Sequence, residues 1–173
     1  MTIQTYTTLA DCVALAEFAH RNQTDKAMLP YIEHPRRVLA AVQAQGALPY
    51  VQMAAILHDV TEDTSFTPNM LLELGVPSSA VELIKLLDRD HSRSIFYNLF
   101  IDSCEGWHND GSLEDRISAF YYSEIKKRPE AKMIKLEDIA DNLQPWRLAY
   151  LPEKDQERLR DRKYKRALEL LNS

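Results

Sequence analysis

Glycine is scarce in this chain, with four glycines among 173 residues. None of them stands in the GxGxxG or GxxxxGK spacing, in which backbone amides of a glycine-rich loop bind phosphate. Any phosphate chemistry in this protein therefore depends on side chains or on a metal ion, and not on a glycine-rich loop.

Cysteine is also rare. Cys12 and Cys104 are the two cysteines, and they have neither the CxxC spacing of a metal or redox motif nor the number that a disulfide framework needs. Both fall in apolar helical patterns, so we expect buried, reduced thiols.

The chain has no long apolar run and no basic leader. Residues 1–6 (Met-Thr-Ile-Gln-Thr-Tyr) carry no basic region followed by an apolar stretch, as a secretory signal would. No apolar run approaches the ~20 residues of a membrane span. The sequence therefore predicts a cytoplasmic protein without a membrane partner.

Positive charge is in deficit, because 21 Lys and Arg face 26 Asp and Glu, for a net charge of −5. This balance disfavours a general nucleic-acid binder, which needs a basic surface. Seven basic residues gather after residue 153, but acidic residues interleave with them, which is typical of a solvated helix face. A phosphate substrate is not excluded, because a local metal ion can dominate the charge of one cleft.

Strand-like alternation is absent, and helical periodicity runs almost throughout. We predict an all-α, single domain over residues 1–173, with a core over about 8–150 and a C-terminal helix over about 153–171. A helix over about 94–104 is expected before the loop at 105–111, and Ser112 with Asp115 resembles a capping box. Capping residues and prolines predict where the other helices begin, namely Thr8, Pro35, Pro49, Thr67-Pro68, Pro77 and Pro129. Gly46 and Gly75 predict where two of these helices end.

The run at residues 54–64 (Ala-Ala-Ile-Leu-His-Asp-Val-Thr-Glu-Asp-Thr) is the most informative part of the chain. His58 and Asp59 offer a nitrogen and an oxygen ligand to one divalent metal ion. Glu62 and Asp63 follow and are suited to handle the protons of an attacking water. If the helix continues past Asp59, these four side chains lie on one side of it. Thr61 and Thr64 are poor helix formers, so the helix could instead end here.

Plausible partners lie elsewhere, namely His34 in Tyr-Ile-Glu-His-Pro and Asp138 in a helical stretch. Lys135, Asp138 and Asn142 share a face at spacings i, i+3 and i+7. The ordinary alternatives are a capping or core role for His34 and an exposed helix carboxylate for Asp138. Other polar residues are interpreted as structural or solvated: Glu137, Asp141, His20, His91 and His108.

Three segments resemble the HD-domain phosphohydrolases, and within them the hydrolase domain of the Rel/SpoT enzymes and their small stand-alone relatives. Residues 19–35 match the segment AH-x-x-Q…K…PYI-x-HP, residues 55–64 match A-x-LHD-x-x-EDT, and residues 135–142 match KL-x-D-x-x-x-N. The family reaction removes pyrophosphate from the 3′ position of ppGpp or pppGpp. The chain is too short to carry the synthetase domain of the bifunctional enzymes as well.

The resemblance implies a helical bundle around one divalent ion, usually Mn²⁺. It implies that Glu62 and Asp63 are the catalytic carboxylates and that Lys26, Asn142 and Tyr97 contact substrate. The ligand set alone would equally accept iron, zinc, cobalt or nickel. The implied metal ligands are His34, His58, Asp59 and Asp138.

The chain departs from the family at three places. Thr24-Asp25 stands where a basic pair often precedes Lys26 and packs on guanine, Asp88 where threonine is common, and Asp141 where histidine or tyrosine often stands. Two alternatives to the (p)ppGpp hydrolase therefore stay open: an HD-type nucleotidase or phosphodiesterase for another small phosphorylated substrate, and a non-catalytic nucleotide-binding regulatory domain. A homo-oligomer is also left open.

Overall fold

The computed structural model describes residues 7–25, 27–100 and 112–173. These residues form helices and no β-strand, with one isolated bridge between Thr24 and Pro30, so the predicted all-α class is confirmed. The helices are α1 (Leu9–His20), α2 (Glu33–Ala44), α3 (Pro49–Leu57), α4 (Val60–Asp63), α5 (Pro68–Glu73), α6 (Ser78–Leu87), α7 (Arg89–Phe100), α8 (Ser112–Lys126), α9 (Pro129–Asn142), α10 (Pro145–Leu148), α11 (Glu153–Glu157), the π-helical segment η2 (Arg158–Tyr164) and α12 (Lys165–Asn172).

Most predicted helix starts coincide with a cap or a proline in the structure. Thr8 and Asp11 form a reciprocal capping box at α1, and Thr67 accepts a hydrogen bond from the Met70 amide at α5. Proline occupies the first turn of α3, α5 and α9, where its missing amide proton costs nothing. Gly75 has a φ of 87°, the left-handed conformation that ends α5.

Two helices begin earlier than predicted. Helix α2 begins at Glu33 and not at Pro35. Helix α7 begins at Arg89 and not near residue 94, because Asp88 Oδ1 accepts a hydrogen bond from the His91 amide 2.9 Å away and so caps the new helix. Its predicted end at Cys104 lies outside the described residues.

The predicted C-terminal helix is divided into α11, the π-helical segment η2 and α12, and α10 before it was not predicted. Leu159 and Leu171 are buried on this segment as expected, whereas Leu168 is only partly covered.

The chain turns at the HD pair. Helix α3 ends at Leu57, and the one-turn helix α4 begins at Val60, so the helix does end here and does not continue through Asp59. Thr61 nevertheless lies inside α4, so its low helix propensity does not account for the break. His58 and Asp59 are therefore presented at a corner, directly after a buried segment.

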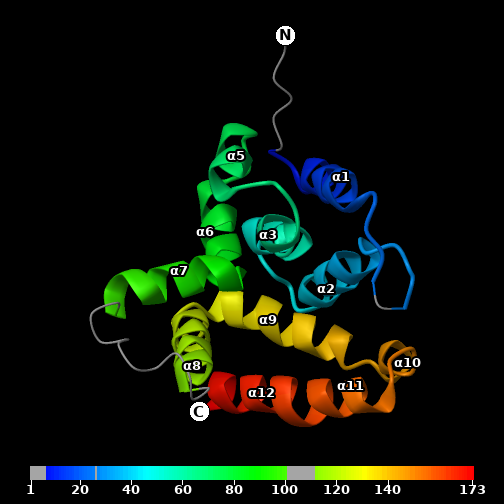
Figure 1. Ribbon diagram of the computed structural model, residues 1–173. Coiled ribbons are helices and arrows are strands. Elements are labelled where there is room, and N and C mark those ends of the chain that lie inside the picture. Colours follow the sequence, from blue (N-terminus) through cyan, green and yellow to red (C-terminus); the bar gives the residue numbers. More distant parts are fainter. Residues whose placement is uncertain (1–6, 26, 101–111) are drawn as a thin grey trace.

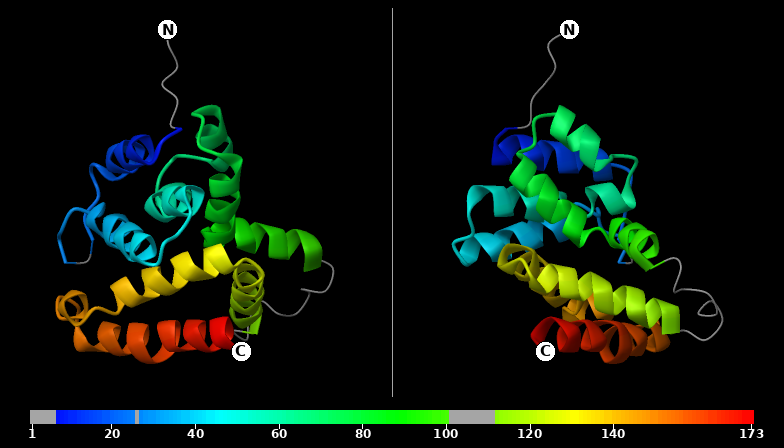
Figure 2. Two further views of the ribbon diagram at one scale, coloured as in Figure 1. Left: turned by 180° about the vertical axis from the view of Figure 1, so that it is seen from behind. Right: turned by 90° about the vertical axis from the view of Figure 1, so that its left-hand side faces the viewer.

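Helix α3 lies at the centre of the bundle, with α1, α2 and α6 packed around it (Figure 1). Helix α9 crosses beneath α2 and α3, and the C-terminal segment from α11 to α12 runs along the far side of α9 in both views of Figure 2. One cluster of buried apolar side chains extends from α1 to α12. None of the described helices has the length and apolar character to span a bilayer.

Candidate metal centre

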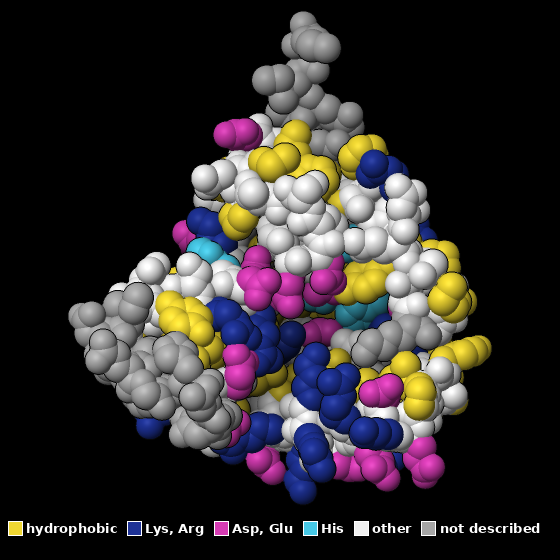
Figure 3. Space-filling model, viewed as in Figure 1, with side chains coloured by type: hydrophobic (Ala, Val, Ile, Leu, Met, Phe, Trp, Pro, Cys, Tyr) yellow, Lys and Arg dark blue, Asp and Glu magenta, His cyan; other side chains and the backbone are white. Residues whose placement is uncertain are grey.

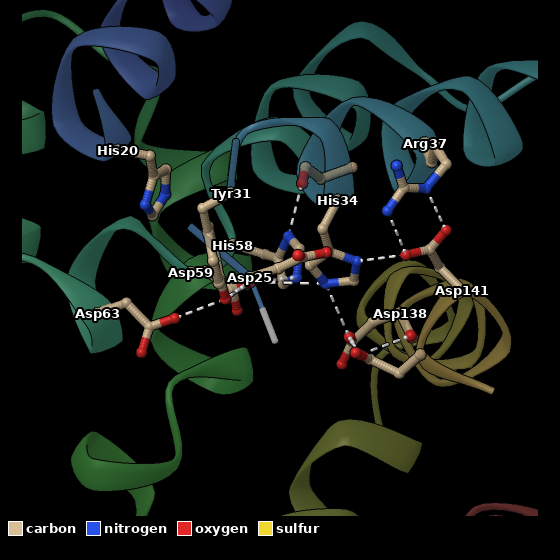
Figure 4. A network of polar contacts seen from close by, with 12 residues as sticks. His20, Asp25, Tyr31, His34, Arg37, His58, Asp59, Asp63, Asp138 and Asp141 are labelled. Carbon is tan, nitrogen blue, oxygen red and sulfur yellow. Dashed lines mark hydrogen bonds and ion pairs between the residues drawn. The ribbon is translucent and has the colours of Figure 1, made fainter. Parts of the chain in front are cut away.

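Four side chains from three parts of the chain converge at one point (Figure 4). Helix α2 supplies His34, the corner after α3 supplies His58 and Asp59, and α9 supplies Asp138. His34 Nε2 lies 3.1 Å from Asp138 Oδ1 and 3.6 Å from Asp59 Oδ2. Candidate ligand atoms of His34, His58 and Asp138 lie within 4.8 Å of one another. Two imidazoles and two carboxylates at these distances are a ligand set for one divalent ion.

His58 carries a free nitrogen aimed at this point. The side chain is 3% exposed, and its Nδ1 donates to the Ala55 carbonyl oxygen 2.8 Å away, since a carbonyl can only accept. This bond fixes the tautomer and leaves the Nε2 lone pair without a hydrogen-bond partner among the described residues, 3.2 Å from Asp59 Oδ2. A buried, unpaired imidazole nitrogen beside carboxylates fits a metal ligand.

His34 is oriented from behind by Asp141. Its Nδ1 donates to Asp141 Oδ2 over 2.7 Å, so its Nε2 faces the other ligands. Asp141 in turn accepts from Arg37 Nε over 2.6 Å and from Arg147. The Asp141 side chain is thus buried and structural, as one of the two interpretations from sequence had it, and the solvated alternative was wrong.

Asp138 is held by its own helix. Lys135 Nζ donates to Asp138 Oδ2 over 2.7 Å, and Asn142 Nδ2 donates to Asp138 Oδ1 over 2.6 Å. Burial disfavours the Asp138 carboxylate, but the Lys135 charge and the histidines outweigh it and hold the pKa of Asp138 well below its usual range. Asp138 is therefore ionised and available as a ligand at neutral pH.

The imidazoles carry the matching shifts. Burial lowers the pKa of His34, but hydrogen bonds to Asp138 and Asp141 outweigh burial and raise the pKa to about 9. Burial also opposes ionisation of Asp59, but the charge of His58 outweighs it and lowers the pKa of Asp59. In the charged form each imidazole carries a second proton, at Nε2; a divalent ion bound here would take the place of that proton and leave the Nδ1 protons in their hydrogen bonds.

Glu62 and Asp63 lie on α4 beside this cluster and are not part of it. Glu62 Oε2 accepts from the Arg89 backbone amide over 3.0 Å, and Asp63 Oδ2 accepts from the Tyr31 hydroxyl over 2.7 Å. Burial raises the pKa of both carboxyls, since neither has a lysine or arginine side chain paired with it among the described contacts. Carboxylates of raised pKa are suited to accept a proton.

A cavity of about 480 Å³ opens over the four-residue cluster. Its lining includes the acidic residues Asp59, Glu62 and Asp63. In Figure 3, acidic side chains border the upper edge of a central hollow, and Lys and Arg side chains gather below it. The basic residues in the lining are Arg89, Lys135, Arg147 and Lys163, and the aromatic ones are Tyr31, Tyr121, Tyr122 and Tyr164.

Of the three residues predicted to contact substrate, one lines the cavity in the described structure. Asn142 lines the cavity. Lys26 lies outside the described residues. Tyr97 on α7 packs against Phe96, with ring centroids 6.3 Å apart, and is not among the described residues of the cavity lining.

No family model matches the chain. Over 84 residues, which are 47% of this chain and 12% of the relative, it is 40% identical to the bifunctional (p)ppGpp synthase/hydrolase SpoT of Escherichia coli strain K12. It matches the guanosine-3′,5′-bis(diphosphate) 3′-pyrophosphohydrolase of Escherichia coli O157:H7 with the same identity and coverage. The matched region is thus a small part of these curated relatives.

A solved structure matches nearly the whole chain. It is described as a metazoan ortholog of SpoT that hydrolyses ppGpp and plays a role in starvation responses. The TM-score is 0.67 at 25% sequence identity, and the match covers 95% of this chain and 85% of that one. The chain resembles SpoT-type hydrolases in sequence and in fold. The resemblance predicted from the three segments is confirmed.

Several residues at the site were missed by sequence reasoning. Tyr31 was noted only as part of a matching segment, and Arg147 was not considered although it contacts Asp141 and lies 3.5 Å from Asp25. Lys163 was assigned to a solvated face; it is exposed as expected, and it also lines the cavity, which the sequence did not indicate. The π-helical segment contributes to this placement, since Leu159, Lys163 and Tyr164 all reach the lining from it.

Proposed function

We propose that the protein is a metal-dependent phosphohydrolase that removes the 3′-pyrophosphate of (p)ppGpp. The observation that carries the proposal is the cluster of three buried residues, His34, His58 and Asp138, with the partly exposed Asp59. It includes the unpaired His58 nitrogen and lies beside Glu62 and Asp63 at one cavity. The names of the relatives support the substrate class.

The cluster would hold one divalent ion, and we propose Mn²⁺. When bound, such an ion lowers the pKa of a water ligand and offsets negative charge on the attacked phosphate. The fixed imidazole tautomers support a divalent ion at this cluster, because the hydrogen bonds to Ala55 and Asp141 leave both Nε2 atoms directed at the carboxylates. The choice of Mn²⁺ rests on the resemblance.

Glu62 and Asp63 take the proton of the attacking water. The water oxygen bonds to the phosphorus attached to the 3′ oxygen, and the bond between that phosphorus and the 3′ oxygen breaks. The proton that a carboxylate took from the water passes to the 3′ oxygen, so that the products are a free 3′-hydroxyl and pyrophosphate. Arg89 and Lys135 line the cavity, where the Arg89 amide contacts Glu62 and the Lys135 ammonium contacts Asp138, and their charges offset the negative charge of the phosphates. Asn142 and Lys26 are proposed substrate contacts, and Tyr97 stays a prediction.

The test is pyrophosphate release from ppGpp by purified protein, with and without added Mn²⁺. We expect GDP and pyrophosphate in equal amounts, dependent on the ion. The variant Asp59→Ala should abolish this release. Its control is Asp161→Ala, because Asp161 is exposed and, in the described contacts, pairs only with its neighbour Arg160. Absence of release from ppGpp by metal-loaded protein would overturn the proposal.

One observation favours a second candidate, a nucleotidase or phosphodiesterase for another base. Thr24-Asp25 stands where the family that the chain resembles often has a basic pair with an arginine that packs on guanine. The Asp25 carboxylate accepts hydrogen bonds from the Ala27 and Leu29 amides. It lies in the cavity lining beside Arg147. Competition of guanine against adenine nucleotides during ppGpp turnover distinguishes the two candidates. Equal competition would favour the second.

A non-catalytic regulatory domain is the third alternative. Binding alone needs no pair such as Glu62 and Asp63, so their place in the cavity argues for catalysis. A role in (p)ppGpp turnover during the stringent response, a cytoplasmic location and a homo-oligomer stay predictions.

A further inference from the structure

Three residues of the segment before α2 have no role as metal ligand or catalytic base in the proposed reaction. His20, Gln23 and Tyr31 lie on the Asp63 side of the site, opposite Arg37 and Asp141, as the labelled side chains of Figure 4 show for His20 and Tyr31. His20 is 2% exposed, although it is a titratable residue at the end of a surface helix. Their contacts lead to α4.

Tyr31 joins the two groups of carboxylates. Its hydroxyl oxygen lies 2.8 Å from Asp59 Oδ2 and 2.7 Å from Asp63 Oδ2. Both carboxylates only accept, so the single hydroxyl proton is shared between them. The Tyr31 ring stacks against His20 with centroids 4.8 Å apart, which restricts where the hydroxyl can lie.

Gln23 fixes the backbone of Asp63. Its Nε2 donates to the Asp63 carbonyl oxygen over 2.7 Å, across forty positions of sequence. Its Oε1 accepts from His20 Nδ1 over 2.6 Å, so the imidazole sets which way the amide faces. Helix α4 is a single turn, and its last carbonyls have no partner within the helix, so this outside donor holds its end.

The three residues are also fixed to one another. The Tyr31 amide donates to the Gln23 carbonyl over 3.0 Å, and Thr24 and Pro30 form an isolated bridge. The Asp25 carboxylate accepts from two backbone amides inside the same loop. These hydrogen bonds hold the described residues of the loop in a defined conformation, from which Gln23 and Tyr31 contact Asp63.

We infer that His20, Gln23 and Tyr31 are positioning residues, which hold the Asp63 carboxylate at a set distance from the metal ligand Asp59. The inference rests on the proposed function, in which Asp63 accepts a proton from the attacking water. It assigns a role to the AH-x-x-Q and PYI parts of the matching segment.

The first test compares matched substitutions. Tyr31→Phe removes one hydroxyl and Gln23→Ala one amide, and both should lower kcat by about 10–100-fold at saturating Mn²⁺, with KM little changed. The controls are Tyr50→Phe, which removes a hydrogen bond to Glu130, and Gln52→Ala, which removes one to the Ala47 carbonyl, both away from the cavity lining. A fall of the same size in the controls would overturn the inference.

A double-mutant cycle separates positioning from general destabilisation. In an Asp63→Asn background, Gln23→Ala should cost no further kcat, because the carboxylate it positions is gone. Additive losses would show that Gln23 acts through another group, and the inference would fall.

A second readout does not depend on turnover. Amide hydrogen exchange at residues 60–64 should be faster in Gln23→Ala than in wild type and unchanged in Gln52→Ala. If wild-type protein releases no pyrophosphate from ppGpp, the proposed function fails, and exchange still decides whether the support exists. Unchanged exchange at residues 60–64 would contradict the support itself.

Discussion

Carboxyl groups on two sides of the cavity have pKa values shifted in opposite directions. The ligand side holds Asp138 with the other predicted metal ligands, and the water side holds Glu62 and Asp63. On the ligand side, Asp138 is paired with Lys135 and His34, and its pKa is held well below the usual range despite burial. On the water side, the hydrogen bonds of the described residues bring neutral donors to Glu62 and Asp63, namely the Arg89 amide and the Tyr31 hydroxyl, and burial raises the pKa of both carboxyls. In the proposed function, the carboxylates with cationic partners are the metal ligands, and those without such partners in the described contacts take the proton.

The largest expected effect comes from removing a ligand. Asp59→Ala deletes the carboxylate that lies between both imidazoles. We expect loss of bound metal and a fall in ppGpp turnover greater than the about 10–100-fold that loss of an outer contact costs. Elemental analysis and a pyrophosphate assay check it, and full metal content in this variant would contradict the ligand assignment.

The water side should separate rate from metal binding. The double variant Glu62→Gln with Asp63→Asn keeps the shape of both side chains and removes their basicity. We expect wild-type metal content and a kcat lowered by about 10²–10⁴-fold, the range for general acid–base catalysis. If the double variant loses its metal, the separation between the two sides is wrong.

The outer support of the ligand side should have an intermediate effect. Asp141→Asn weakens the acceptor for His34 Nδ1 and leaves Arg37 and Arg147 without their common carboxylate. Metal affinity should fall by about 10–100-fold, measured by titration with Mn²⁺. Asp161→Asn on the exposed C-terminal segment is the matched control, and equal affinities in the two variants would remove the role given to Asp141.

The smallest expected effect is a shift in the pH dependence of kcat. Because burial raises the pKa of Glu62 above the ordinary 4.5, the carboxylate gains its proton at a higher pH than a free glutamate does. At saturating metal, kcat should therefore fall on the acid side with a midpoint above 4.5, and Glu62→Gln should remove that limb. Bound metal is followed in parallel, so that loss of the ion is not mistaken for this titration. A midpoint at or below the ordinary value counts against a buried base.

Local signals in the sequence predicted much of the fold. Thr8, Thr67 and the first-turn prolines announce helix starts by chemistry that acts within one turn. The early start of α7 was missed because its cap, Asp88, could not be identified from sequence. An aspartate after a buried helix can equally bind a side chain, as Asp88 also does with Thr61. The division of the C-terminal segment by η2 leaves no local pattern, since it depends on packing against the rest of the bundle.

The sequence predicted the four residues that the structure brings together, and it missed several residues that contact them. His34, His58, Asp59 and Asp138 occur in recognisable segments, and the structure brings them together. Tyr31 and Arg147 act through contacts with residues far along the chain or on another element, so periodicity does not show them. The helical pattern alone does not distinguish Asp141 from a solvated carboxylate, because its partners His34, Arg37 and Arg147 lie on other elements.

The most direct test of the account follows ppGpp turnover and bound metal together during a Mn²⁺ titration of wild type and of the Glu62→Gln, Asp63→Asn double variant. The account predicts the same binding curve for both proteins, turnover that rises with occupancy in wild type, and almost no turnover in the variant. Turnover that is independent of occupancy, or a variant that hydrolyses ppGpp like wild type, would contradict it.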